Sequence, residues 1–210
     1  MGIDAPAEAN ASQSAQRRIG LTGGIASGKS TVGRLLAEGH GVPVLDADAY
    51  AREALAPGSA AARAVIERFG TLDRAALGRI VFADANERRW LEQLVHPLVR
   101  ARFETALAQL AGEPVVVLMI PLLFEAGLEG LCSETWLVDC DEAQQLERLM
   151  ARNGLSEAEG RSRIAAQWPL SRKRELANVV LDNRGTPEAL ASQVEGALLA
   201  GALQPRTKRA

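Results

Sequence analysis

The chain has 210 residues, of which 47% are hydrophobic and 24% are charged, so it is long enough to bury a real core in one domain or two small ones. Its formal net charge at pH 7 is −2, which argues against a generally basic nucleic-acid-binding protein. No apolar run is long enough to cross a bilayer. We therefore expect a compact globular protein that has neither a nucleic-acid nor a membrane partner.

Residues 1–17 are mostly small and polar and contain no apolar block, so we expect a disordered tail and no signal peptide there. Residues 202–210 are predicted to form a short basic tail. Cys132 and Cys140 have neither the density of a disulfide scaffold nor the C-x-x-C spacing of a redox or zinc site. Reduced thiols are the simplest interpretation, and they predict a cytoplasmic protein.

The first predicted element is a strand over residues 18–22, and a glycine-rich segment follows it directly. Residues 23–30, GGIASGKS, fit the phosphate-binding loop pattern G-x-x-x-x-G-K-[ST]. Apolar residues within 32–36 then recur at helical spacing. Glycines in this context let the backbone wrap its N–H groups round a phosphate at the start of a helix.

Two side chains of this loop have predicted roles. Lys29 should reach the β and γ phosphates of a nucleotide, and Ser30 should hold Mg²⁺ through its hydroxyl. The pattern thus indicates a nucleoside triphosphate. It leaves open whether the protein is a small-molecule kinase, an ATP-driven motor or a GTPase switch.

The second predicted strand, residues 42–45, ends at a pair of carboxylates. Asp46 and Asp48 follow it directly, on the edge of an open α/β sheet where ligands bind. In a kinase, one of them could accept the proton of the acceptor hydroxyl and order the metal's water shell. The alternative is that they are solvent-facing or helix-capping aspartates.

A long insertion, residues 51–113, is predicted to be almost entirely helical because apolar residues recur on one face of three successive stretches. A simple crossover between parallel strands needs only one helix, so the surplus indicates a separate subdomain. The apolar positions are Ala61, Val65 and Phe69, then Trp90, Leu91, Leu94 and Val95, then Phe103, Leu107 and Leu110.

Two further strands, residues 115–120 and 136–139, come after the insertion. The helical pattern that follows places Arg148 and Arg152 four residues apart on one face. Arginines on a mobile helix could close over a triphosphate and neutralise the charge that develops during phosphoryl transfer. The alternative is a solvated cationic face paired with acids such as Glu147.

The last strand, residues 179–182, precedes a helix with Thr186 as its N-cap and Gly201 just beyond its end. Strands alternating with helices predict an α/β fold, a P-loop NTPase-type open parallel sheet flanked by helices. The nucleotide-binding core comprises residues 18–50, 114–140 and 177–201. Residues 51–113 form a helical acceptor subdomain, and 141–176 form a helical lid.

The ordered motifs TGGIASGKST, LDADAYARE, LDRAAL, VHPLVR, IPLLFEAGL, the segment from Gln145 to Arg152, and VVLDN closely resemble those of the dephospho-CoA kinase family, from Arg18 to about Leu199. The phosphate loop alone is generic, whereas its combination with DAD, HP and PLLFE is specific. The resemblance implies transfer of the ATP γ phosphate to the ribose 3′-hydroxyl of dephospho-CoA, giving coenzyme A and ADP. It implies Mg²⁺ as cofactor and leaves a monomer or a weak homo-oligomer open.

The resemblance also implies roles for individual residues. Asp48 is the candidate base, Asp46 supports it or the metal's water shell, and Glu125 is either an organiser of partners at the site edge or part of a structural plug. Ala26 replaces a frequent glycine, which should be tolerated if its φ is negative. The nucleotide loop comprises Thr22, Gly23, Gly24, Ala26, Ser27, Gly28, Lys29, Ser30 and Thr31; Arg148 and Arg152 belong to the lid; Asn183 lies near the adenine; Arg79, His96 and Pro97 shape the acceptor site.

Two other functions remain as alternatives. One is a kinase of the same architecture that acts on another acceptor, such as a nucleoside monophosphate or a sugar. The other is a GTP-binding switch, against which the chain has neither an N-K-x-D guanine signature nor a D-x-x-G motif after a strand.

Overall fold

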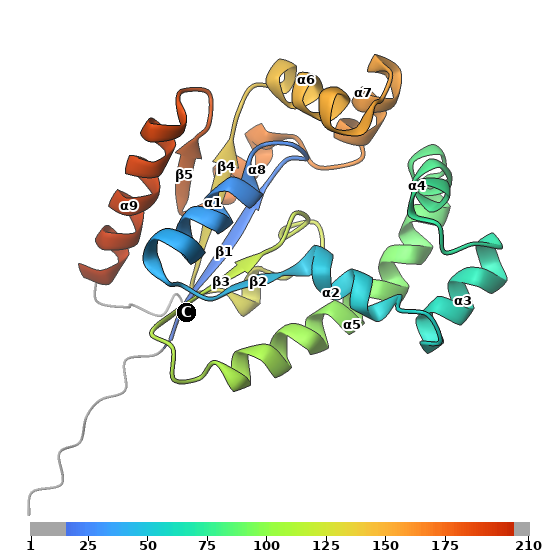
Figure 1. Cartoon of the computed structure of the whole chain (residues 1–210), viewed down its shortest axis with the longest axis horizontal. Coiled ribbons are helices and arrows are strands. Elements are labelled where there is room, and N and C mark those ends of the chain that lie inside the picture. The colour runs from blue at the N-terminus through green and yellow to red at the C-terminus, as the bar shows by residue number, and fades with distance from the viewer. Residues whose placement is uncertain (1–15, 204–210) are drawn as a thin grey trace, which may run out of the picture.

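The computed structural model describes residues 16–203, so most of both predicted tails lies outside the described residues. Five parallel strands form one sheet in the order β2-β3-β1-β4-β5, with the helices arranged around it (Figure 1). This order confirms the predicted open parallel sheet. The strands are β1 (Arg17–Gly23), β2 (Val44–Asp46), β3 (Val115–Met119), β4 (Glu134–Asp139) and β5 (Val179–Asp182).

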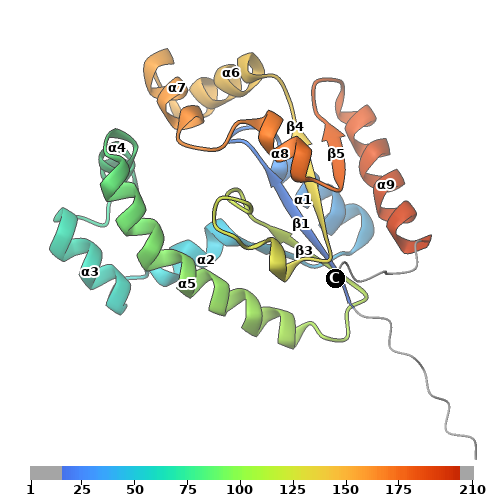
Figure 2. The same cartoon turned by 180° about the vertical axis from the view of Figure 1, so that it is seen from behind.

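Helices cover both faces of the sheet. The first helix and the last lie on one face, and α5 and α8 lie on the other, as Figures 1 and 2 show from opposite sides. The helices are α1 (Lys29–Arg34) with a π-helical turn (Leu35–Gly39), α2 (Ala47–Ala54), α3 (Ala60–Phe69), α4 (Arg74–Ala83), α5 (Ala85–Gln109), a 3₁₀ turn (Glu129–Leu131), α6 (Glu142–Asn153), α7 (Glu157–Ala165), α8 (Leu170–Leu176) and α9 (Pro187–Leu203).

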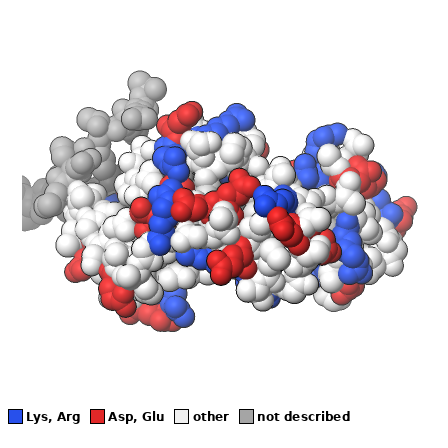
Figure 3. Space-filling view, turned by 90° about the horizontal axis from the view of Figure 1, so that it is seen from above, with Lys and Arg blue, Asp and Glu red and all other residues white. Residues whose placement is uncertain are grey.

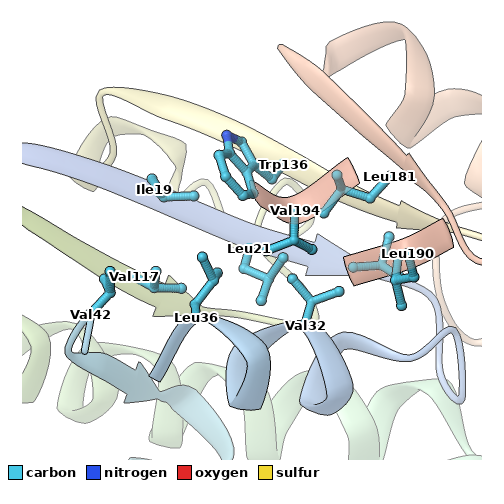
Figure 4. Packing of buried hydrophobic residues seen from close by; sticks show 11 residues of the cluster. Ile19, Leu21, Val32, Leu36, Val42, Val117, Trp136, Leu181, Leu190 and Val194 are labelled. Atoms are coloured by element: carbon cyan, nitrogen blue, oxygen red, sulfur yellow. The ribbon is translucent and has the colours of Figure 1, made fainter. Parts of the chain in front are cut away.

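The sheet is buried on both faces because successive side chains of a strand point to opposite sides. Ile19 and Leu21 of β1 face α1 and α9 and are fully buried. Figure 4 shows this layer, in which Trp136 of β4 packs beside them. On the opposite face, Val116 and Leu118 of β3 pack against the C-terminal half of α5. Burial on both sides explains the nearly unbroken apolar runs of these strands.

Both ends of the described chain meet at one buried arginine. Arg17, predicted to lie in the tail, is the first residue of β1 and is ion-paired with Glu134. Its guanidinium donates to the carbonyls of Ala197 (3.1 Å) and Leu198 (2.6 Å) in α9. A Cβ at position 201 would lie 1.9 Å from that guanidinium. The prediction that α9 stops before Gly201 is therefore wrong, because this glycine makes room for Arg17 inside the helix.

The insertion between β2 and β3 consists of four helices, but it does not separate cleanly from the sheet. The proposed boundary at residues 50 and 51 falls inside α2, and the second half of α5 packs on β3. Within residues 16–203, no helix is long and apolar enough to cross a membrane. Cys132 and Cys140 are free thiols, as predicted.

Candidate active site

The glycine-rich loop joins β1 to α1 at the carboxyl edge of the sheet (Figure 1). In open parallel sheets this edge is where ligands bind, and the start of α1 adds a positive partial charge there. Figure 3 looks down on this side of the molecule and shows basic and acidic side chains interspersed. The site is therefore defined by local geometry and not by a broad field of one sign.

Two glycines of the loop are required by the close approach of side chains from other elements. Gly28 has a φ of 107°, and a Cβ there would lie 2.2 Å from Nδ2 of Asn183. At Gly24 a Cβ would lie 2.1 Å from Nε2 of Gln145. Any larger residue would push away the groups that hold the loop in shape.

Alanine at position 26 was predicted to be tolerated if its φ were negative, and the structure does not meet that condition. Its φ is +59°, in the left-handed region, and it is the one non-glycine residue with positive φ within residues 16–203. A Cβ in this conformation clashes with the following carbonyl oxygen and costs about 1–2 kcal/mol. The residue is therefore accommodated with backbone strain in the loop.

Replacing Ala26 by glycine should consequently raise the free energy of unfolding by about 0.5–1 kcal/mol, because the relieved strain exceeds the entropy gained by the unfolded chain. Urea unfolding of both proteins measures the change. Ala101→Gly, at an exposed position inside α5, is the control and should lower stability by about 1 kcal/mol. A loss of stability in Ala26→Gly comparable to that of the control would contradict the strain.

Three amide side chains hold the loop from outside. The N–H of Ile25 donates to Oε1 of Gln167 (2.8 Å), and its carbonyl accepts from Nε2 of Gln145 (2.8 Å). Nδ2 of Asn183 donates to the carbonyl of Ser27 (2.7 Å). Asn183, predicted to lie near the adenine, thus uses its side chain to fix the loop. Sequence reasoning assigned neither glutamine a role: Gln145 begins a segment of the resemblance in which only Arg148 and Arg152 were given functions, and Gln167 belongs to no motif.

Lys29 is the first residue of α1, and its side chain reaches back to the start of the loop. Its ammonium donates to the carbonyls of Gly23 (3.0 Å) and Gly24 (2.7 Å). Burial, and secondly the charge of Lys173, lower the pKa of Lys29 to about 8, while Asp48 acts in the opposite direction. A cation held this way by loop carbonyls can exchange them for phosphate oxygens.

Asp46 and Asp48 have different surroundings. Oδ1 of Asp46 accepts the N–H of Asp48 (2.9 Å) and caps α2, so the helix-capping alternative holds for Asp46. Asp48 is solvent-accessible as a residue, yet desolvation of its carboxyl group, and secondly the charge of Asp46, raise its pKa. Lys29, Arg52 and Arg74 oppose that rise. Asp48 is therefore the carboxylate that is electrostatically coupled to the loop lysine.

Asp46→Asn should shift the acid limb of kcat/KM for the acceptor to lower pH. Because the pKa of Asp48 is raised, its carboxyl group loses its proton only at higher pH. Removing the negative charge of Asp46 lowers that pKa, so the base becomes available at lower pH. Asparagine can still cap α2. Asp84→Asn, which alters the cap of α5, is the matched control and should leave the limb in place. An upward or absent shift in Asp46→Asn would remove Asp48 from the titrating role.

A mostly apolar cavity of about 240 Å³ opens beside Asp48. It lies between α2, α5 and the loop after β3, and its lining includes Leu91, Val95 and His96. Burial lowers the pKa of His96, so this imidazole favours its neutral form in the cavity wall. Of the two ionisable residues predicted to shape the acceptor site, Arg79 and His96, the structure brings His96 to the cavity that Asp48 lines. Pro97, predicted with them, lies inside α5 and is not part of the lining.

Arg79, the other predicted acceptor residue, does not line this cavity. It is exposed on α4, and its charge acts on Glu159 of α7. Arg79 therefore faces the lid. Besides Lys29, the cations that influence Asp48 are Arg52 and Arg74, to which sequence reasoning gave no role.

The two predicted lid arginines lie on α6 toward the phosphate loop. Nη2 of Arg148 donates to the carbonyl of Asn183 (3.2 Å), and the charge of Arg152 lowers the pKa of Lys29. Neither arginine forms an ion pair with Glu147 in the described part of the chain. Arg148 is half-buried, whereas Arg152 is exposed and its Nε donates to Oδ1 of Asn153 (3.0 Å). The lid role of the two arginines stays a prediction.

The remaining predicted loop residues differ in exposure. Thr22 is fully buried, and its hydroxyl donates to the carbonyl of Pro121 (3.2 Å). Ser27 is also fully buried. Ser30 and Thr31 lie in the first turn of α1, where Ser30 is exposed. The hydroxyl of Ser30 is thus accessible to a ligand in the loop.

A parallel sheet of this order, with a lysine-bearing phosphate loop facing a carboxylate and an acceptor cavity, defines the P-loop kinase class. A sequence profile described as dephospho-CoA kinase matches residues 17–188. The chain belongs to the dephospho-CoA kinase family. It is therefore an enzyme of the kinase class, from a family that carries out the last step of coenzyme A synthesis.

Curated relatives agree with this assignment. A dephospho-CoA kinase from Synechococcus sp. (strain CC9605) is 66% identical over 183 residues, which cover 83% of this chain and 88% of the relative. One from Prochlorococcus marinus (strain MIT 9313) is 59% identical over 191 residues, which cover 85% and 94%. These relatives set aside the GTP-binding switch and the kinases of other acceptors.

Solved structures support the fold. A crystal structure of a Thermus thermophilus protein is 42% identical, covers 91% of this chain and 100% of its own, and gives a TM-score of 0.77. A dephospho-CoA kinase from Campylobacter jejuni is 24% identical and covers 89% of this chain and 98% of its own, with a TM-score of 0.63. At that identity the second likeness concerns the fold alone.

Proposed function

We propose that this chain transfers the γ-phosphoryl group of ATP to the ribose 3′-hydroxyl of dephospho-CoA, giving coenzyme A and ADP. One observation carries the assignment of roles: Asp48 lines the apolar cavity and is also coupled electrostatically to Lys29 of the phosphate loop. An alcohol bound in the cavity and a triphosphate bound in the loop would therefore meet at this carboxylate.

The residues around that point suit phosphoryl transfer. Backbone N–H groups of the loop and the start of α1 bind the triphosphate, and Lys29 moves from the loop carbonyls to the β and γ phosphates. Asp48 orients the hydroxyl and accepts its proton. Arg148 and Arg152 close from α6 and neutralise charge on the phosphoryl group in the transition state.

Mg²⁺ fits the residues present. Within residues 16–203, no group of three or more His, Cys, Asp or Glu side chains could hold a metal ion. Magnesium bound with a nucleotide needs only one or two protein oxygens beside the phosphates and waters. The exposed hydroxyl of Ser30 supplies one, and Asp46 supports the water shell. When bound, the ion neutralises charge on the β and γ phosphates.

The acceptor side has room for a nucleotide with a long arm. The cavity beside Asp48 is mostly apolar and includes His96, which suits an adenine ring or the pantetheine chain. The charges of Arg52 and Arg74 lie near enough to Asp48 to oppose the rise in its pKa. We assign them to the diphosphate of dephospho-CoA.

We further propose that the enzyme acts in the cytoplasm, as a monomer or a weak homo-oligomer, without a nucleic-acid or membrane partner. The interspersed charges on the face in Figure 3 and the free thiols support this setting. Its partners are then the two substrates.

Steady-state assays with several acceptors test the proposal. We expect kcat/KM for dephospho-CoA to exceed that for AMP by at least about 10²-fold, because the extra groups of the acceptor bind the insertion. Competition between ATP and GTP for the free protein should favour ATP. Turnover of AMP at the same rate or faster would contradict the proposed acceptor.

A further inference from the structure

A lysine that the proposed chemistry does not use is buried beside the active site. Lys173 of α8 is fully buried. Its ammonium donates to Oε1 of Glu125 (2.8 Å) and to the carbonyl of Pro121 (3.0 Å). Burial lowers the pKa of Lys173, and the hydrogen bond and charge of Glu125 oppose that effect. The pair therefore compensates a charge that would otherwise be costly to bury.

Glu125 and Pro121 extend these contacts to two other segments. Oε1 of Glu125 also accepts the backbone N–H of Trp168 (3.0 Å), in the link between α7 and α8. The carbonyl of Pro121 also accepts the hydroxyl of Thr22 (3.2 Å), at the end of β1. The ion pair thus ties together the loop after β3, the α7–α8 link and the start of the phosphate loop.

The residue before Trp168 contacts the phosphate loop directly. Gln167 accepts the N–H of Ile25, and fixing the backbone of Trp168 fixes where Gln167 can reach. The indole of Trp168 is further held by the guanidinium of Arg172, which lies 3.3 Å from the ring centroid. The position of the α7–α8 link therefore bears on the shape of the loop.

Buried ion pairs are often replaceable by apolar residues of similar volume without loss of stability, so the burial of this pair is weak evidence for a purely stabilising role. Among the charged groups, Lys173 has the largest effect on the pKa of Lys29, and the carbonyl of Pro121 that it binds also accepts from Thr22 at the start of the loop. Oε2 of Glu125 is buried and has no hydrogen-bond partner among the described residues. All the hydrogen bonds of this carboxylate described here are therefore made by Oε1, to Lys173 and Trp168.

We propose that Glu125 and Lys173 are positioning residues for the phosphate-binding loop, which they hold in its phosphate-accepting shape through Trp168 and Gln167. This inference rests on the proposed function, in which that loop binds ATP. The pair makes no contact with the reacting atoms, and its effect passes through the peptide of Ile25.

The main test is the paired variant Glu125→Gln/Lys173→Met, in which both charges disappear. A neutral amide oxygen accepts the N–H of Trp168 more weakly than a carboxylate does, and without Lys173 the ammonium no longer fixes that oxygen in place. We expect KM for ATP to rise about tenfold, with kcat and KM for dephospho-CoA within about threefold of wild type. Assays are run well below the melting temperature of the variant, so that a loss of stability does not enter KM.

A double-mutant cycle tests the path through Gln167. Gln167→Ala alone should raise KM for ATP, and adding it to the paired variant should raise KM no further, since both changes release the same peptide. The matched control is Arg100→Met/Glu104→Gln, an exposed ion pair on α5 far along the chain from the loop. It should leave every kinetic constant unchanged.

Several results would overturn the inference. These are a paired variant with a lowered melting temperature but wild-type KM for ATP, equal rises in KM for both substrates, and additive effects in the cycle. If the paired variant does not fold, Glu125→Gln alone serves, and it should raise KM for ATP at least about threefold. Lys29→Ala distinguishes failure of the positioning role from failure of the proposed function. If Lys29→Ala also binds ATP with wild-type affinity, the loop does not bind ATP and the proposed function fails as well.

Discussion

Asp48→Asn is expected to lower kcat by about 10²–10⁴-fold while the Kd for ATP stays within about threefold of wild type. The change removes the group that accepts the proton of the acceptor hydroxyl, and it leaves the loop that binds the triphosphate untouched. Isothermal titration with a non-hydrolysable ATP analogue, together with single-turnover kinetics, separates the two quantities.

Glu53→Gln is the matched control for Asp48→Asn, since it neutralises a carboxylate on the same helix that is ion-paired with Arg102 and does not line the cavity. It should turn over at close to the wild-type rate. Wild-type turnover in Asp48→Asn itself would remove this residue from the role of base.

Lys29→Ala should damage both ATP binding and turnover. The ammonium on its flexible side chain can stay in contact with the β and γ phosphates as the transition state forms. Its loss should therefore raise Kd for ATP at least about tenfold and lower kcat about 10²-fold. Titration with the ATP analogue and steady-state kinetics measure the two effects.

The control for Lys29→Ala is Arg34→Ala, which removes an exposed cation from the last turn of α1 and should change neither quantity. An Lys29→Ala enzyme that binds ATP with wild-type affinity would mean that the triphosphate is held elsewhere.

The strands were predictable because their apolar runs reflect burial on both faces, a local property of the sequence. All five are found, within a few residues of the predicted bounds. The starts of two strands are shifted by two residues: β4 begins at Glu134 and not at Trp136, and β2 begins at Val44 and not at Val42. Pro43 has no N–H to donate, although its carbonyl accepts from Val117, so the ladder cannot start earlier.

The end of α9 and the start of β1 were not predictable, because each depends on the other. Gly201 is a usual helix terminator, yet here it makes room for the guanidinium of Arg17, whose partners lie about 180 residues away along the chain. No local pattern encodes such a contact.

The residues of the site also fall into those that a local motif predicts and those that only the folded chain brings together. Residues 22–31 and the pair Asp46 and Asp48 belong to short motifs, and their chemistry could be predicted from spacing and from the resemblance. Gln145 and Gln167 hydrogen-bond the loop from the lid side, and their side chains reach it only once the chain has folded. Arg79 was assigned to the acceptor site from the resemblance; α4 places it outside the cavity and near enough to Glu159 of α7 to affect its pKa, and its role stays a prediction.

A crystal structure of the enzyme with dephospho-CoA, Mg²⁺ and a non-hydrolysable ATP analogue tests the proposed mechanism most directly. It should show the triphosphate within residues 23–31, and the ribose 3′-hydroxyl about 3 Å from the carboxylate of Asp48 and in line with the γ phosphorus. A 3′-hydroxyl bound away from Asp48, or a triphosphate outside that loop, would contradict it.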